Sequence, residues 1–254
     1  MAEDPWLDHW HVYIHYCSSD TWAGTRAASQ HTGGFTFHGR HILAAVLRSL
    51  AEHHGLLTAS SVVLTGTSAG AQGAVLNCDL VAARLQEAAT NNTDMEVRCV
   101  ANAPEFYPPE VHTAGCRTRQ PDYQDNLTSF WGRQMDESCL QFAAENGVDS
   151  AGELCGVTAN FVPFVSTPLV VLSSHEDTAF TAGFGCAPAY SSPEYGQFRA
   201  EWMAAHSGLV TDLMADWPEI AFYAPNCRGH VLDFEADKHM SVVFDNVTSR
   251  GKNI

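Results

Sequence analysis

Hydrophobic and polar residues follow one another along this chain in blocks that predict strands followed by helices. The apolar run Val62-Val63-Leu64 is typical of a buried strand, whereas apolar residues at helical spacing over 72–86 indicate a helix behind it. Strands that alternate with helices predict an α/β-hydrolase-like fold with a mainly parallel sheet and helices on both faces. The predicted strands are 11–16, 61–64, 96–101, 168–172 and 219–223, and the predicted helices are 39–53, 72–86 and 193–215.

Segment 105–164 breaks this regular pattern. It contains Pro108-Pro109, three cysteines and Phe130-Trp131, and it shows no sustained period. Insertions beyond the strand ends of an open α/β sheet lie over the ligand pocket, so we predict an irregular or short-helical lid within a single domain over 1–254. Six aromatic residues in and beside it could line an acyl pocket, although each is also typical of an ordinary core: Phe106, Tyr107, Phe130, Trp131, Phe161 and Phe164.

Composition narrows the choice of partners. The 254 residues are 45% hydrophobic, which is enough for one sizeable core, and 13 Lys plus Arg against 29 Asp plus Glu give a formal charge of −16. Such a protein repels phosphate backbones, which argues against a nucleic-acid partner. It also repels polyanions such as pectate, but an acidity that serves only solubility explains the charge equally well. No apolar run approaches the roughly 20 residues needed to cross a bilayer.

Eight cysteines lie far apart, without a Cys-x-x-Cys pair, and their even number fits disulfides in an oxidising compartment. Three glycosylation acceptor sequences begin at Asn91, Asn126 and Asn246, and together with the cysteines they favour a secreted glycoprotein. The segment 1–10 has no hydrophobic stretch typical of a signal peptide. Either a start further upstream or a cytosolic protein with buried thiols fits that observation.

Gly66-Thr67-Ser68-Ala69-Gly70 lies between the strand and the helix described above, which is the context of a nucleophile elbow. In such a tight turn, a side chain at either glycine would collide with the neighbouring chain. Ser68 would then be exposed as a nucleophile, and the Ala69 amide at the helix start could hold a developing oxyanion. A turn of small residues without any chemistry is the alternative interpretation.

A serine nucleophile needs a base and an acid that orients it, and hydrolases of this class carry them later in the chain. Asp177 ends the predicted strand over 168–172, but Glu176 could take the same role, and only one of two successive side chains can face the site. Among 13 histidines, His230 is favoured because it follows the last predicted strand and lies near Cys227, which could pin its loop. His38, His112 and His175 remain competitors, and His206 is expected in polar surroundings.

The sequence resembles the pectin acetylesterase and Notum family of serine carboxylesterases. The segment Tyr16-Cys-Ser-Ser-Asp-x-Trp-x-Gly24 is the most specific match, and its form is closer to Notum-like members. The resemblance implies Ser68 as nucleophile, Asp177 as orienting acid and His230 as base. The matching pieces are 12–24, 37–42, 66–73 with Asn77, 130–131 with Cys139, the strand ending at Asp177, and Cys227-x-x-His230.

Two features depart from the family pattern. Relatives have a Gly-Gly-Gly-Trp-Cys turn before the Tyr-Cys segment, which supplies further oxyanion donors, and we expect this chain to be amino-terminally incomplete because that turn is absent from it. At 102–106 the sequence is Asn-Ala-Pro-Glu-Phe, where relatives tend to have Asp-Ser-Gly before an aromatic residue. That loop borders the pocket of relatives, so substrate preference is open at this point.

These observations predict a serine esterase that removes acetyl or fatty acyl groups from a polysaccharide or a lipidated protein. The alternative is a catalytically impaired member of the fold that binds acylated ligands without turnover. A metal-dependent deacetylase is disfavoured because no His-x-x-x-His or similar cluster is present, and we predict neither a metal nor another cofactor. The sequence does not indicate the oligomeric state.

Overall fold

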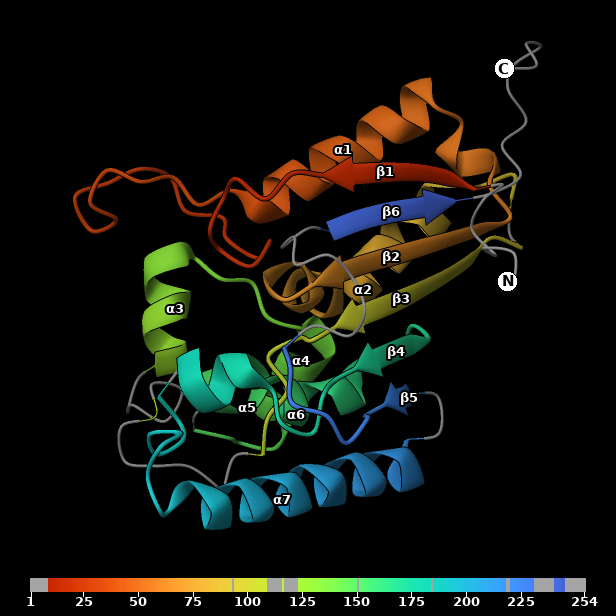
Figure 1. Ribbon diagram of the computed structural model, residues 1–254. Helices are drawn as coiled ribbons and strands as arrows, with labels where there is room; N and C mark the ends of the chain where they lie inside the picture. Colours follow the sequence, from red (N-terminus) through yellow and green to blue (C-terminus); the bar gives the residue numbers. More distant parts are fainter. Residues whose placement is uncertain are drawn as a thin grey trace.

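A twisted mixed sheet organises the protein, as the computed structural model shows (Figure 1). The structure describes residues 9–92, 94–108, 116, 123–149, 151–183, 185–217, 220–230 and 240–244. Within them the sheet has six strands in the order β1-β6-β2-β3-β4-β5. The strands are β1 (Trp10–Ile14), β2 (Ser61–Thr67), β3 (Glu96–Asn102), β4 (Leu169–Leu172), β5 (Ile220–Tyr223) and β6 (Met240–Phe244).

The order of pairing confirms the predicted α/β fold and adds one strand to it. Strands β2 to β5 pair in parallel, while β6 lies antiparallel between β1 and β2. The prediction that the strand over 219–223 is the last one was therefore wrong. Strand β6 was not predicted from the sequence, although Val242-Val243-Phe244 is an apolar run like that of β2.

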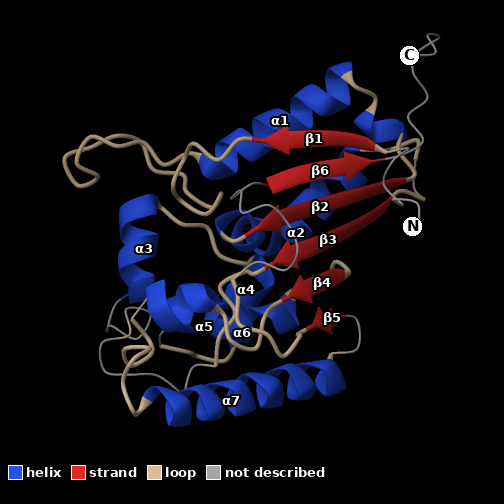
Figure 2. Ribbon diagram, viewed as in Figure 1, coloured by secondary structure: helices blue, strands red, loops and turns tan. Residues whose placement is uncertain are grey.

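Seven α-helices in the described part surround this sheet. Figure 2 shows α3 and α5 beyond the carboxyl ends of β2, β3 and β4, and α7 alongside β5. Segment 105–164 is thus largely helical where it is described. The helices are α1 (Gly39–His53), α2 (Ala69–Ala88), α3 (Tyr123–Trp131), α4 (Glu137–Glu145), α5 (Ala151–Gly156), α6 (Thr158–Phe161) and α7 (Tyr195–Asp216).

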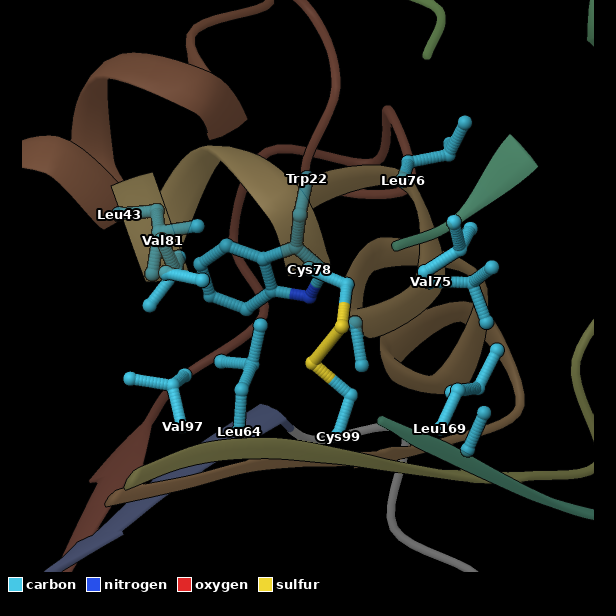
Figure 3. Close-up of a cluster of buried hydrophobic side chains, with 14 of the residues drawn as sticks. Trp22, Leu43, Leu64, Val75, Leu76, Cys78, Val81, Val97, Cys99 and Leu169 are labelled. Atoms are coloured by element: carbon cyan, nitrogen blue, oxygen red, sulfur yellow. A yellow bond between two sulfur atoms is a disulfide. The ribbon is translucent and has the colours of Figure 1, made fainter. Parts of the chain in front are cut away.

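The main core lies between the sheet and helices α1 and α2 (Figure 3). Helix α2 is buried along most of its length, and Leu43 of α1 packs against it with Leu64 from β2. The Cys78–Cys99 disulfide crosses this core from α2 to β3. A second cluster joins Trp202 and neighbouring residues of α7 to Phe106. Burial of these side chains fixes the strand ends from which the candidate site projects.

The loop after β1 is attached to the core by buried polar groups. The Asp20 carboxylate is fully buried and accepts hydrogen bonds from the amides of Trp22 and of Gly39, the first residue of α1. Asn77 of α2 donates to the Trp22 carbonyl at 3.2 Å. A buried carboxylate that accepts two backbone amides satisfies groups that would otherwise be unpaired. These bonds hold the Ser-Ser-Asp-x-Trp segment next to α2.

The cysteines form three disulfides, which link α2 to β3, α4 to α5, and the segments around Cys116 and Cys186. Cys17 and Cys227 are free thiols in the described part of the chain. Cys227 therefore does not hold the His230 loop through a disulfide; its carbonyl accepts a hydrogen bond from the Glu176 amide instead.

Candidate active site

Ser68 lies at the sharp turn between β2 and α2. Its backbone has a φ of 56° and a ψ of −117°, a conformation that residues with a Cβ rarely adopt. A Cβ at Gly66 would come within 2.1 Å of the Gly70 carbonyl oxygen, so only glycine fits there. The sequence thus forms a strained strand-to-helix turn that presents the serine at the carboxyl end of the sheet.

Asp177 and His230 reach Ser68 from the loops that follow β4 and β5. The Oγ of Ser68 lies 2.7 Å from Nε2 of His230, and Nδ1 of His230 lies 2.8 and 2.9 Å from the two carboxylate oxygens of Asp177. With the Nδ1 proton donated to Asp177, Nε2 is free to accept the proton of Ser68. The structure therefore brings together the three residues selected from the sequence, in a chain of hydrogen bonds.

The acid is buried and the imidazole is accessible. The Asp177 side chain is 2% exposed, whereas the His230 side chain is 26% exposed. Burial raises the pKa of the Asp177 carboxyl, and the hydrogen bonds from His230 and from the Ala179 amide oppose that shift. A proton that moves onto Nε2 would be stabilised by the adjacent carboxylate.

Glu176 points away from this arrangement. Its buried carboxylate contacts Tyr195, Arg199 and Arg228 instead of His230. Because successive side chains on an extended segment point in opposite directions, Asp177 and Glu176 cannot both face the serine.

The competing histidines lie elsewhere. His38 precedes α1 and packs edge-on against His41, and His175 is hydrogen-bonded through Nδ1 to Nδ1 of His206 at 2.9 Å. His112 lies outside the described residues. His206 is 1% exposed and packs edge-on against a phenylalanine ring, so the expectation of polar surroundings was wrong.

A cavity of about 270 Å³ opens beside Ser68 and His230. Ala69, the first residue of α2, lies in its wall, where the leading amides of a helix have no partner within the helix. Two atoms of the lining residues are buried without a hydrogen-bond partner in the described part of the chain: Oγ1 of Thr21 and Nε2 of Gln72. The remaining lining residues are Ala103, Glu105, Ala179 and Phe180.

None of the six aromatic residues suggested for an acyl pocket is among these lining residues. Phe106, Tyr107 and Phe161 are buried in the two hydrophobic clusters, and Phe130 lines a separate cavity with His31. Thr21, Gln72 and Phe180 were not predicted to line the site, although Thr21 and Gln72 lie within the matching segments and Phe180 lies three residues after Asp177. Their positions depend on the turn after each strand, which hydrophobic periodicity does not report.

In the ranges that the structure describes, no cluster of three or more His, Cys, Asp or Glu side chains could hold a metal ion. Over the same ranges, no helix combines the length and apolar character needed to span a membrane.

Comparisons with known proteins show the family of this chain. A family model described as pectinacetylesterase matches residues 1–203, and the chain belongs to that family. The palmitoleoyl-protein carboxylesterase NOTUM of Drosophila melanogaster is 26% identical over 92% of this chain and 34% of its own length. Pectin acetylesterase 7 of Arabidopsis thaliana is 26% identical over 70% of this chain and 42% of its own length.

The fold has a close counterpart among solved structures. The structure of the Wnt deacylase Notum from Drosophila superimposes with a TM-score of 0.70 and 25% sequence identity, over 88% of this chain and 60% of that one. The chain therefore spans only part of the length of the relatives that it matches.

Proposed function

We propose that the protein hydrolyses carboxylic esters with Ser68 as nucleophile, His230 as general base and Asp177 as the acid that orients the imidazole. The observation that carries the proposal is the continuous hydrogen-bond chain from Ser68 through His230 to Asp177, beside an open cavity. Nucleophile, base and orienting group within hydrogen-bond reach are the signature of an activated serine. Membership of an esterase family supports the same reaction class.

The reaction follows from the positions of these groups. Nε2 of His230 takes the proton of Ser68 as Oγ forms a bond to the ester carbonyl carbon, and the resulting oxyanion accepts a hydrogen bond from the Ala69 amide. His230 then gives that proton to the departing alkoxide, which leaves an acyl group on Ser68. A water molecule, deprotonated by the same imidazole, attacks the acyl carbonyl and releases the carboxylic acid and the free serine.

The cavity supports a preference for short acyl groups. At about 270 Å³ it lies just below the roughly 300–1,000 Å³ usual for ligand pockets. Substrates of this site would be O-acyl groups on a polysaccharide or on a protein, with helices of segment 105–164 as a lid.

Three disulfides support maturation in an oxidising compartment. We therefore expect the protein to act in the secretory route or outside the cell. Of the three glycosylation acceptors, Asn126 lies exposed on α3, whereas Thr93 and the acceptor that begins at Asn246 lie outside the described residues.

A fluorophosphonate probe tests the serine assignment, because it reacts covalently only with an activated hydroxyl. We expect peptide mapping to find the label on Ser68, and Ser68→Ala to abolish both labelling and p-nitrophenyl acetate hydrolysis; removal of such a serine typically lowers kcat roughly 10⁶-fold. Ser129→Ala is the matched control, because Ser129 also contacts an imidazole, that of His31 at 3.3 Å, but is exposed.

The outcomes separate the candidate functions. Faster hydrolysis of p-nitrophenyl acetate than of the octanoate ester would support the short-acyl preference. Hydrolysis that survives Ser68→Ala would eliminate the assignment of the nucleophile. A folded protein without labelling or turnover would favour a member of the fold that only binds acylated ligands.

A further inference from the structure

Glu176 is a buried carboxylate that the proposed reaction does not use. Its side chain is 1% exposed, yet it is adjacent to Asp177 on the segment that follows β4. Two guanidinium groups and a phenol meet it: Arg199 and Tyr195 come from α7, and Nε of Arg228 approaches Oε1 at 3.2 Å from the loop after β5. Burying a charge is costly unless it is paired, and here three donors from two segments pair it.

The backbone of the same residue is also joined to the His230 loop. The Gly229 amide donates to the Glu176 carbonyl at 3.1 Å, and the Glu176 amide donates to the Cys227 carbonyl at 3.4 Å. Glu176 and Arg228 therefore face each other as an isolated parallel β-bridge. The side chain and the backbone of Glu176 thus attach the loop that carries His230 to the segment that carries Asp177.

We propose that Glu176 and Arg228 form a positioning pair that sets the register of the His230 loop against Asp177, so that the imidazole stays aligned between the acid and Ser68. The inference deepens the proposed ester hydrolysis and rests on it for its catalytic consequence. Neither residue touches the reacting atoms. Arg228 acts because its guanidinium links the loop to a carboxylate that cannot move without losing its other partners.

The position of Arg228 distinguishes this role from a general stabilising one. Its guanidinium also lies over the Tyr190 ring at 4.3 Å from the ring centre, which limits the directions in which the side chain can turn. The Arg228 and Arg199 side chains are 43% and 42% exposed, so their ion pairs with Glu176 are similarly solvated. Removal of either should cost similar, modest stability. Only Arg228 is connected to the loop that carries His230.

These two arginines provide a matched pair of variants, Arg228→Ala and Arg199→Ala, and Arg228→Lys is a conservative variant that keeps the charge. The first readout is the NMR signal of the hydrogen-bonded Nδ1 proton of His230, assigned by its absence in His230→Gln. This signal reports the alignment of the imidazole whether or not the protein turns over a substrate. The second readout is the rate constant of fluorophosphonate labelling at Ser68.

We expect Arg228→Ala to lose or broaden the His230 proton signal and to slow labelling on the order of tenfold to a hundredfold, the scale of a misplaced catalytic group. Arg199→Ala should keep the signal and label within about twofold of the parent, and Arg228→Lys should restore part of the rate. Equal effects of the two alanine variants, or no effect of either, would overturn the positioning role. A parent protein that shows the same NMR contrast but takes no label would refute the proposed hydrolysis and leave the positioning inference standing.

Discussion

His206 is a buried imidazole that packs against Phe106 of the second hydrophobic cluster, and burial lowers its pKa to about 3, with a further contribution from the nearby His175. Its Nε2 lies 3.2 Å from Oγ of Ser173, and its Nδ1 contacts His175. Both ring nitrogens are therefore occupied within the protein. A proton added there would have to be accommodated without water and against a second imidazole.

The lowered pKa of His206 makes the folded protein less stable as the pH falls. An unfolded chain takes up a proton at His206 near the ordinary histidine pKa of about 6.5, whereas the folded protein does not until about pH 3. The contribution of His206 to the free energy of unfolding is thus fully present above pH 6.5 and is lost as the pH falls. We expect this loss to approach 1.4 kcal/mol per pH unit between about pH 6 and pH 4.

Urea denaturation across this pH range gives the free energy of unfolding of the parent and of His206→Gln. The difference between the two isolates the contribution of His206, because the effects of the carboxyl groups that both proteins share cancel. As the pH falls, the free energy of unfolding should decrease more for the parent than for His206→Gln. His53→Gln, at the exposed end of α1, is the control for replacement of an imidazole at the surface. A difference independent of pH would show that His206 is not a buried neutral imidazole.

The sequence predicted the residues around Ser68 better than it predicted His206. Ser68, Asp177 and His230 each follow an identifiable strand, so the topology of the sheet brings them to one edge. His206 lies on the buried face of α7, four residues after Trp202, but only the tertiary packing shows that its ring lies against Phe106. The choice between Glu176 and Asp177 likewise depended on which way one extended segment faces.

At the scale of elements, the contact between α2 and β3 is held by a covalent link as well as by packing. Cys78 and Cys99 are both fully buried, and their disulfide closes a loop with a sequence separation of 21 (Figure 3). A cross-link of this span restricts the unfolded chain and contributes about 3 kcal/mol. The link also joins the helix that begins at Ala69 to the strand beside β2.

We expect the double substitution Cys78→Ala, Cys99→Ala to lower the free energy of unfolding by about 3 kcal/mol or slightly more, because two buried sulfur atoms are removed as well. Chemical denaturation followed by circular dichroism measures the change. Cys17→Ser, at an exposed free thiol, is the control and should be neutral. An unchanged denaturation midpoint in the double variant would contradict a structural role for this disulfide.

The helices and strands were predicted to within a few residues wherever a single chemical pattern marked them. Helix α1 begins and ends at the predicted residues, whereas α2 starts three residues earlier than predicted because the small residues after Ser68 give no apolar signal. Strand β6 was missed although Val242-Val243-Phe244 is an apolar run like that of β2, and its place between β1 and β2 is known only from the pairing. Local periodicity does not encode such long-range pairing.

At the scale of the whole molecule, the most distinctive property is the charge of −16, produced by 29 acidic and 13 basic residues. A field of this sign extends over roughly 30 Å at 0.01 M ionic strength and over about 10 Å at 0.1 M. It acts on a substrate before any contact at Ser68 is made. A charged polymer and a neutral one of equal acetyl content therefore experience different association rates.

This difference predicts a salt dependence that separates two interpretations of the acidity. If the field acts on substrates, kcat/KM for acetyl esters on polygalacturonate should rise several-fold as ionic strength increases from about 0.01 M to about 0.1 M, because repulsion between like charges is screened. The rate on an acetylated neutral glucomannan should stay constant, and p-nitrophenyl acetate provides a control for effects of salt on the chemical step. Acetate release, measured at matched acetyl concentrations, gives the dependence of kcat/KM on ionic strength for each polymer. If kcat/KM for both polymers is independent of ionic strength, the acidic surface serves solubility alone. The protein would then exert no net repulsion on a polyanion that approaches the cavity.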